Sequence, residues 1–172
     1  MIIAKTPFRM SFFGGGTDMP EFFNKFGGSV ISTSFDKYCY ATLRHLPPFF
    51  DYRSEIAYSK IERVTDAKDL EHPLVKNAMQ YLDIRDIRLT YEADLPARSG
   101  LGTSSSFAVG MLNAFHRLKG KTADAKQLAD EAIYVERVLC GEAGGWQEGT
   151  GYAHVGLLQR TVCRHDAADG IV

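Results

Sequence analysis

The sequence has few of the features that mark membrane proteins, disulfide-stabilised proteins or zinc-binding domains. It contains three cysteines in 172 residues (Cys39, Cys140 and Cys163), which are far apart and form no CxxC pair, so neither a disulfide framework nor a zinc site is indicated. No apolar run approaches the ~20 residues of a membrane span. The N-terminal segment, MIIAKTPFRM, also lacks the apolar core of a signal peptide. We therefore expect a cytoplasmic protein that does not act at a membrane.

An excess of charge of either sign is also missing. The chain has 20 Lys and Arg residues against 21 Asp and Glu residues, a formal net charge of −1. Nucleic-acid-binding modules need clustered basic residues, and no run of interleaved basic and aromatic residues is present. A nucleic-acid partner is therefore not expected. The composition, with 45% hydrophobic and 24% charged residues, is typical of a globular domain, and the length suits a single one.

The expected secondary structure changes from strands and turns to helices along the chain. Alternating or β-branched and aromatic residues predict strands, and apolar residues spaced by three or four predict helices. One expected strand starts at residue 2, and a second ends at Phe13. Further strands are expected at 29–33, 37–43, 56–59 and 87–91. One expected helix starts at His72-Pro73. A second runs from the glycines at 100–102 to near Gly120, and a third spans about 124–139. Strands followed by long helices indicate an α+β fold.

The most informative segment is LPARSGLGTSSS, residues 95–106. A strand ends before it, two glycines make a tight turn, and hydroxyl residues open a helix. Glycines let the backbone approach a ligand closely, and the first amides of a helix lack intrahelical partners and attract anions. The hydroxyls of Thr103, Ser104 and Ser105 add donors or Mg²⁺ ligands. The segment therefore predicts a phosphate site.

Two other phosphate-binding motifs do not describe this turn. No Gly-Lys-Ser/Thr follows it, so it is not a Walker A loop, and it lacks the βαβ unit of a Rossmann fingerprint. The alternative that stays open is a serine-capped helix after a tight turn, because serine is a favoured N-cap. Four consecutive hydroxyl residues, Thr103 to Ser106, are more than one cap needs.

The pattern P-x-x-x-G-L-G-[ST]-S-S resembles the central motif of the GHMP kinases, a family of small-molecule kinases. Two further segments agree in order and separation. TPFRMSFFGGGTD, residues 6–18, resembles the N-terminal sugar-binding motif, and Glu136 followed by GGWQE, residues 144–148, resembles the segment that carries two acidic residues. Within the family, FFGGGTD and LPARSGLG look most like D-glycero-D-manno-heptose 7-phosphate kinases. The resemblance covers most of residues 1–148.

The resemblance implies a nucleotide site and a metal site. Backbone amides in the turn would hold the phosphates of ATP. Ser104 and Glu136 would bind Mg²⁺, a hard cation that prefers oxygen ligands. Without the motif, Glu136 would be read as a solvent-facing helical carboxylate near Arg137. The residues implied for ATP binding are Gly100, Leu101, Gly102, Thr103, Ser104 and Ser105.

The resemblance also implies a sugar or sugar-phosphate substrate, with a heptose 7-phosphate as the expected one. Gly15, Gly16, Thr17 and Asp18 would bind it, since a carboxylate accepts hydrogen bonds from sugar hydroxyls. The alternative for Asp18 is to cap a short helix near residues 21–23. Arg9 would lie near the transferred phosphate, where arginine suits phosphate geometry; its alternative is a surface or edge-strand arginine.

The main departure from the family pattern lies at the catalytic acid. Many members have Asp where this chain has Glu148, which is longer by one methylene, and a misplacement of about 1 Å can cost on the order of 10²-fold in rate. After Glu148 the resemblance becomes weak. We therefore also consider a non-catalytic nucleotide- or sugar-binding remnant.

The implied fold is the ribosomal protein S5 domain 2-like N-terminal half of these kinases. Residues 1–172 would form this ATP-binding domain, divergent or truncated after about 148, and the family's C-terminal domain would be missing. Loss of that half would expose an apolar interface and allow self-association. We expect the phenylalanines at positions 8, 12, 13, 22, 23 and 26 to belong to the core rather than to a base-stacking platform.

Overall fold

The fold is a mixed β-sheet covered on one side by helices. A computed structural model describes residues 1–96 and 99–142, and the backbone of residues 159–163. The strands run in the order β1-β2-β5-β3-β4, and β6 also pairs with β2. All pairs are antiparallel except β3 with β5. The strands are β1 (Ile2–Phe13), β2 (Gly28–His45), β3 (Ser54–Ala57), β4 (Ile61–Val64), β5 (Ile87–Ala93) and β6 (Gln159–Cys163). The expected α+β class is confirmed.

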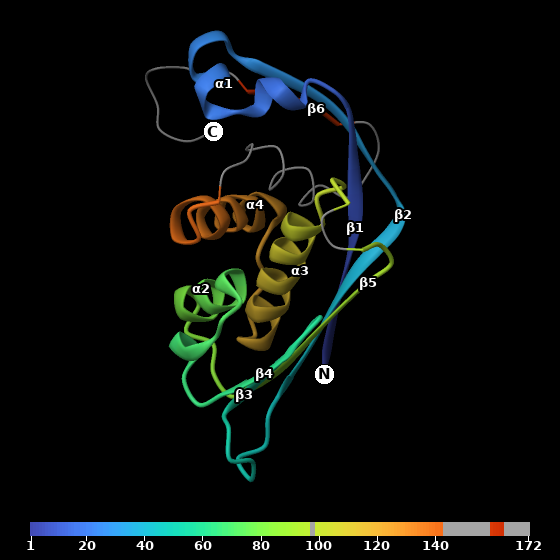
Figure 1. Cartoon of the computed structure of the whole chain (residues 1–172). Helices are drawn as coiled ribbons and strands as arrows, with labels where there is room; N and C mark the ends of the chain where they lie inside the picture. The colour runs from blue at the N-terminus through green and yellow to red at the C-terminus, as the bar shows by residue number, and fades with distance from the viewer. Residues whose placement is uncertain (97–98, 143–158, 164–172) are drawn as a thin grey trace.

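Helices α2, α3 and α4 lie on one side of the sheet, with α3 packed directly against β1 and β2 (Figure 1). Helix α1 and the start of β2 lie at one end of the molecule, beyond these three helices (Figure 1). The helices and helical turns are η1 (Gly15–Asp18), α1 (Pro20–Phe26), η2 (Ala67–Asp69), α2 (Pro73–Tyr81), α3 (Thr103–Leu118), α4 (Ala125–Ile133) and η3 (Tyr134–Leu139). The predicted starts at Pro73 and after the glycine turn are confirmed.

Two pairs of predicted strands are each one continuous strand. The segments expected at either end of residues 2–13 join as β1, and those at 29–33 and 37–43 join as β2. Proline is tolerated in a strand at the edge of a sheet, and β1 pairs only with β2 among the described strands. A shift of register between Pro7 and Phe8 accommodates the proline. The end of β1 leads into the Gly15–Asp18 segment, whereas the glycine turn lies between β5 and α3.

The core forms where α3 meets the sheet. Phe115 and Met111 of α3 are fully buried, as are Phe8 of β1 and Leu43 of β2. The helix approaches β1 closely at Gly110, where an added Cβ would lie 2.6 Å from the Thr6 hydroxyl. Glycine at this position therefore allows α3 to pack closely against β1.

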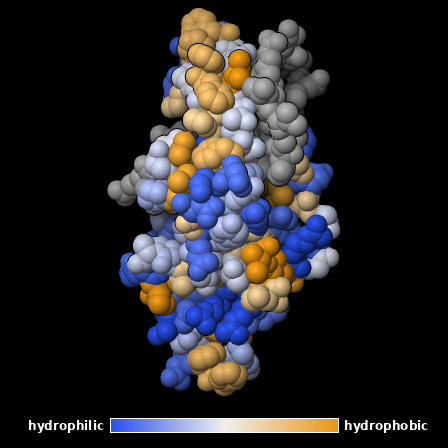
Figure 2. All heavy atoms as spheres, turned by 90° about the vertical axis from the view of Figure 1, so that its right-hand side faces the viewer, coloured by the Kyte–Doolittle hydropathy of each residue, from blue (hydrophilic) through white to orange (hydrophobic). Residues whose placement is uncertain are grey.

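The expectation that the N-terminal phenylalanines are core residues is wrong for most of them. Phe8 and Phe23 are buried, but Phe26 is 74% exposed and Phe13 is 72% exposed. Periodicity could not reveal this, because the exposed residues belong to the end of β1 and to α1, and these elements lie at an end of the sheet that α2, α3 and α4 do not cover (Figure 1). Apolar side chains gather at the same end in the space-filling view (Figure 2). The exposed members are Phe12, Phe13, Phe22 and Phe26.

Within the part of the chain that the structure describes, no helix combines the length and the apolar character needed to cross a membrane.

Candidate functional site

The glycine turn opens directly into α3. Gly100 and Gly102 have φ angles of +74° and +68°, which glycine adopts without strain. A Cβ added to Gly100 would meet nothing within 4 Å. The first bond of the helix runs from the Ser106 amide to the Gly102 carbonyl. The amides of residues 103–105 therefore precede the intrahelical ladder and are available to an anion.

The serine hydroxyls of this turn do not cap the helix. The N-cap is Gly102, and no side chain makes a capping hydrogen bond there. Instead the Ser105 hydroxyl donates to the Glu136 carboxylate, at 3.0 Å from Oε2 and 3.2 Å from Oε1. The hydroxyl of Ser104 also interacts with this carboxylate. The alternative of a serine-capped helix is therefore excluded, and two candidate ligands from distant parts of the sequence meet.

Glu136 is buried, with 2% of its surface exposed. It is therefore not the solvent-facing carboxylate of the alternative interpretation. Burial raises its pKa to about 7, against smaller lowering contributions from Ser105 and Arg137. A buried carboxylate of this kind costs free energy unless a positive charge or hydrogen bonds compensate it. Its environment is typical of a functional group rather than of a surface helix.

The helix that carries Glu136 is irregular at this point. Asp124 caps α4 by accepting a hydrogen bond from the Gln127 amide at 2.8 Å, which agrees with the helix start predicted from the sequence. From Tyr134 to Leu139 the helix continues as a π-helix, and the Cys140 amide bonds to the Val135 carbonyl. π-helical turns are rare and are frequently found at functional sites. Glu136 lies within this turn and is one of its buried residues.

Strand β1 connects Arg9 to the same region. The Ser106 hydroxyl donates to the Pro7 carbonyl at 3.2 Å, so β1 is held against the first turn of α3 two residues before Arg9. Arg9 is buried, with 8% exposure, and donates to the Ser11 hydroxyl. Arg9 is therefore a buried cation rather than a surface arginine, although β1 is an edge strand among the described strands.

The turn predicted to bind the sugar follows β1. Asp18 is 2% exposed, whereas Gly15 and Gly16 are exposed and have open space where a side chain would be. The N-cap of α1 is Met19 rather than Asp18, and no side chain caps that helix. Asp18 is therefore not a capping residue, and a buried carboxylate lies beside an open, side-chain-free surface.

One predicted site residue, Glu148, lies outside the described residues, so the structure does not place it. The sequence interpretation also missed a contact: it did not identify Ser105 as the serine that bonds Glu136. Which serine faces inward depends on where α3 starts. A prediction that the helix begins at Thr103 could therefore have identified Ser105 as the buried serine.

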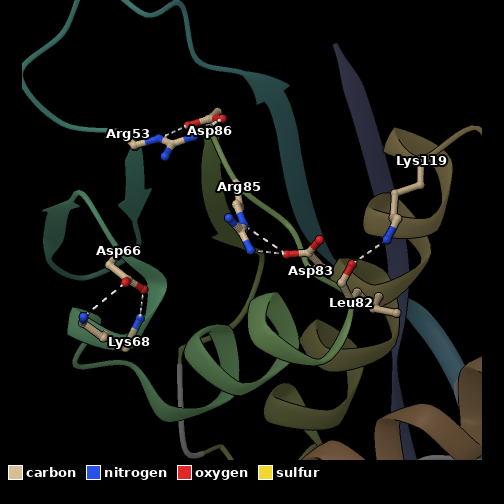
Figure 3. Close-up of polar contacts among 8 residues, drawn as sticks. All are labelled: Arg53, Asp66, Lys68, Leu82, Asp83, Arg85, Asp86 and Lys119. Atoms are coloured by element: carbon tan, nitrogen blue, oxygen red, sulfur yellow. Dashed lines mark hydrogen bonds and ion pairs between the residues drawn. The ribbon is translucent and has the colours of Figure 1, made fainter.

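A second concave region lies away from this site, between the end of α2 and the strands β3 and β5. Its volume is about 280 Å³, and none of the predicted site residues that the structure describes lines it. The charged side chains around it pair with one another, as Figure 3 shows for Arg53 with Asp86, at 2.6 and 2.8 Å, and for Arg85 with Asp83. This region is separate from the glycine turn.

Comparison with known families and curated proteins identifies relatives of the chain. Residues 72–150 match the family model described as the GHMP kinases N terminal domain. The D-glycero-alpha-D-manno-heptose 7-phosphate kinase of Campylobacter jejuni is 27% identical over 159 residues, which cover 86% of this chain and 46% of that protein. The L-fucokinase/L-fucose-1-P guanylyltransferase of Bacteroides fragilis is 24% identical over 191 residues, which cover 92% of this chain and 20% of that protein.

Solved structures share the fold. A D-glycero-D-manno-heptose 1-phosphate kinase from Bacteroides thetaiotaomicron has a TM-score of 0.82 at 24% identity, over 94% of this chain and 56% of that one. The mevalonate kinase of Methanococcus jannaschii has a TM-score of 0.69 at 17% identity, over 88% of this chain and 50% of that one. The chain thus spans about half the length of these structures.

Proposed function

Residues 72–150 match the family model of the GHMP kinases N terminal domain, and from this match we propose that the protein is an ATP-dependent small-molecule kinase. It transfers the γ-phosphate to a hydroxyl of a sugar or sugar phosphate. The observation that carries the proposal is the contact between the Ser105 hydroxyl and the buried Glu136, directly beside the open glycine turn. A purely structural turn has no need of a buried carboxylate at this place.

The nucleotide binds at the glycine turn in this proposal. The amides of residues 100–105 hold the phosphates, because the helix N-terminus provides both donors and partial positive charge. Open space at Gly100 leaves room for the phosphates. Phosphoryl transfer depends mainly on positioning and charge stabilisation, and a rigid turn at the start of a buried helix provides positioning.

The donors around Glu136 suit Mg²⁺. Mg²⁺ is usually held by one or two carboxylates together with substrate phosphates, and here one carboxylate stands beside two hydroxyls. Ser104, Ser105 and Glu136 would hold the ion. When bound, the ion would neutralise charge on the transferring phosphate. Glu136 must lose its proton to take part, and a nearby cation lowers the pKa of a carboxyl group.

The acceptor binds at the turn before α1. The Asp18 carboxylate accepts hydrogen bonds from sugar hydroxyls, and the bare backbone at Gly15 and Gly16 allows close approach. The acceptor oxygen attacks the γ-phosphorus, the bond to the β-phosphate oxygen breaks, and ADP leaves. Glu148 takes the proton of the acceptor hydroxyl, and the positive charge of Arg9 stabilises the transferred phosphate. The relatives named for heptose phosphates support a heptose 7-phosphate as the acceptor, and ATP as donor supports a cytoplasmic location.

The test is to measure ATP binding with and without Mg²⁺, and then transfer of labelled γ-phosphate to a panel of sugar phosphates. We expect transfer to a heptose 7-phosphate, and loss of at least about tenfold in kcat/KM for Ser105→Ala and for Glu136→Ala. Ser59→Ala, at an exposed serine outside the site, is the matched control. Transfer that is unchanged in both site variants would overturn the assignment. Mg²⁺-dependent ATP binding without any transfer would instead support a non-catalytic nucleotide-binding protein.

A further inference from the structure

Thr17, although it lies in the predicted sugar-binding segment, uses its hydroxyl within the protein. The hydroxyl oxygen is 2.8 Å from the Gly14 carbonyl and 3.0 Å from the Ser29 carbonyl, either of which can accept its proton. The same oxygen accepts a hydrogen bond from the Ser29 amide at 3.1 Å. A hydroxyl has one proton and two lone pairs, so these main-chain contacts occupy most of its hydrogen-bonding capacity. The Thr17 bridge, defined as these contacts to Gly14 and Ser29, joins η1 to β2.

The bridge requires a very close approach of two backbones. A Cβ on Gly28 would lie 2.3 Å from the Thr17 carbonyl oxygen, and a Cβ on Gly14 would lie 1.9 Å from the Ser29 carbonyl oxygen. Gly14 also has a φ of +85°. Gly15 and Gly16, in contrast, have open space around the missing side chain. The glycines of this segment therefore have two functions: Gly14 and Gly28 allow docking on β2, and Gly15 and Gly16 remain open.

The bridge attaches to the start of β2, where β6 pairs with one edge of the strand and the pairing with β1 begins two residues further on. β1 pairs with this strand as far as Phe13 opposite Ile31, and β6 pairs with residues 28–32 on the other edge. The adjacent Asp18 is buried at the end of the docked turn. Rigid support of this kind fixes a side chain far better than a free loop does.

We propose that Thr17 and Gly28 are positioning residues: together they hold the Gly15–Asp18 turn on β2 and so place the Asp18 carboxylate for the acceptor. Neither residue needs to touch the acceptor, and Gly28 has no side chain with which to do so. This inference rests on the proposed function, in which Asp18 binds the acceptor. It assigns Thr17 a role that differs from direct substrate contact.

The test uses the full chain with Thr17→Val, which keeps the shape and removes the hydroxyl, and Thr17→Ser, which restores it. Calorimetry measures affinity for a sugar phosphate and, separately, for MgATP. Loss of one or two hydrogen bonds predicts about tenfold weaker sugar-phosphate binding for Thr17→Val, wild-type binding for Thr17→Ser, and unchanged MgATP binding in both. Thr65→Val, at an exposed threonine near the second concave region, is the matched control.

Hydrogen exchange provides a second measurement that does not depend on activity. The Ser29 amide, which donates to Thr17, is expected to exchange about tenfold faster in Thr17→Val, while the amides at the start of α3 keep their rates. Unchanged exchange at Ser29 would overturn the bridge. Faster exchange with wild-type sugar-phosphate affinity would overturn its positioning role. If the wild-type chain binds the sugar phosphate but transfers no phosphate, only the proposed kinase function is contradicted. The role of the Thr17 bridge is tested by sugar-phosphate affinity and does not depend on transfer.

A variant at Gly28 separates positioning from contact. Gly28→Ala pushes the added methyl against the Thr17 carbonyl and is expected to weaken sugar-phosphate binding at least as much as Thr17→Val does. Because both changes disturb one bridge, the double variant is expected to be no more than about twofold weaker than Gly28→Ala alone. Fully additive effects would show that the two residues act independently and would contradict the proposal.

Discussion

Replacement of Glu136 by glutamine should make the protein more stable at neutral and alkaline pH. In the folded chain, burial raises the pKa of this carboxyl from 4.5 to about 7. Between these values the folded state keeps a proton that the unfolded state has lost, so stability falls as pH rises. A shift of this size corresponds to about 3 kcal/mol once the pH is above 7. Glutamine carries no charge at any pH and avoids this cost.

The assay is urea unfolding of the wild type and of Glu136→Gln between pH 4.5 and pH 8.5. The two proteins should be equally stable near pH 4.5, and the advantage of the variant should grow to about 3 kcal/mol near pH 8. Glu21→Gln, at an exposed position in α1, should show no such trend. A constant difference across the pH range, or a wild type that is the more stable protein at pH 8, would refute the argument.

The same pair of proteins tests the link between Glu136 and the metal. A ligand that binds only the folded state stabilises it. Saturating MgATP at pH 8 should therefore raise the unfolding free energy of the wild type more than that of Glu136→Gln, because glutamine cannot supply the negative charge. Equal stabilisation of both proteins by MgATP would show that Glu136 does not hold the metal.

Three further changes have defined outcomes. Gly110→Ala should lower the unfolding free energy by about 1–3 kcal/mol in urea titrations, because its methyl meets the Thr6 hydroxyl. Thr6→Ala in the same chain should recover part of the loss. If the effects of the two substitutions simply add, the clash with Thr6 is not the cause. Gly102→Ala should cost about 1–2 kcal/mol at its positive φ and weaken ATP binding by calorimetry; wild-type ATP affinity would argue against the phosphate site. Asp18→Asn should raise KM for the sugar phosphate about tenfold with KM for ATP unchanged, and an unchanged sugar KM would remove Asp18 from the acceptor site.

The sequence predicted the elements that depend on local patterns. Pro73 at a helix start, the apolar face from Phe107 to Phe115, and the helix start near Asp124 are all local signals, and each agrees with the structure. The tight turn into α3 was also predicted, because glycines at positions 100 and 102 before a run of hydroxyl residues indicate a turn followed by a helix start. The short strand β4 was missed, because Glu62 and Arg63 lie at its centre and its pairing depends on β3.

The parts that could not be predicted depend on tertiary contacts. Two separate strands were expected within residues 2–13, but they form the single strand β1; an edge strand tolerates Pro7, and only the assembled sheet shows that β1 is an edge among the described strands. The exposure of Phe13 and Phe26 depends on where the helices end over the sheet. The contact between Ser105 and Glu136 joins residues 31 positions apart, and the Thr17 bridge reaches Ser29, 12 positions away, so no local pattern reveals them.

The most direct test of the central claim is an NMR titration of the isotopically labelled chain with MgATP, following the backbone amides one by one. If the turn before α3 cradles the phosphates, the largest shift changes will fall on residues 100–105, and Glu136→Gln will weaken the binding that they report. Saturable MgATP binding that leaves these amides unmoved, or no binding at all, would contradict the account.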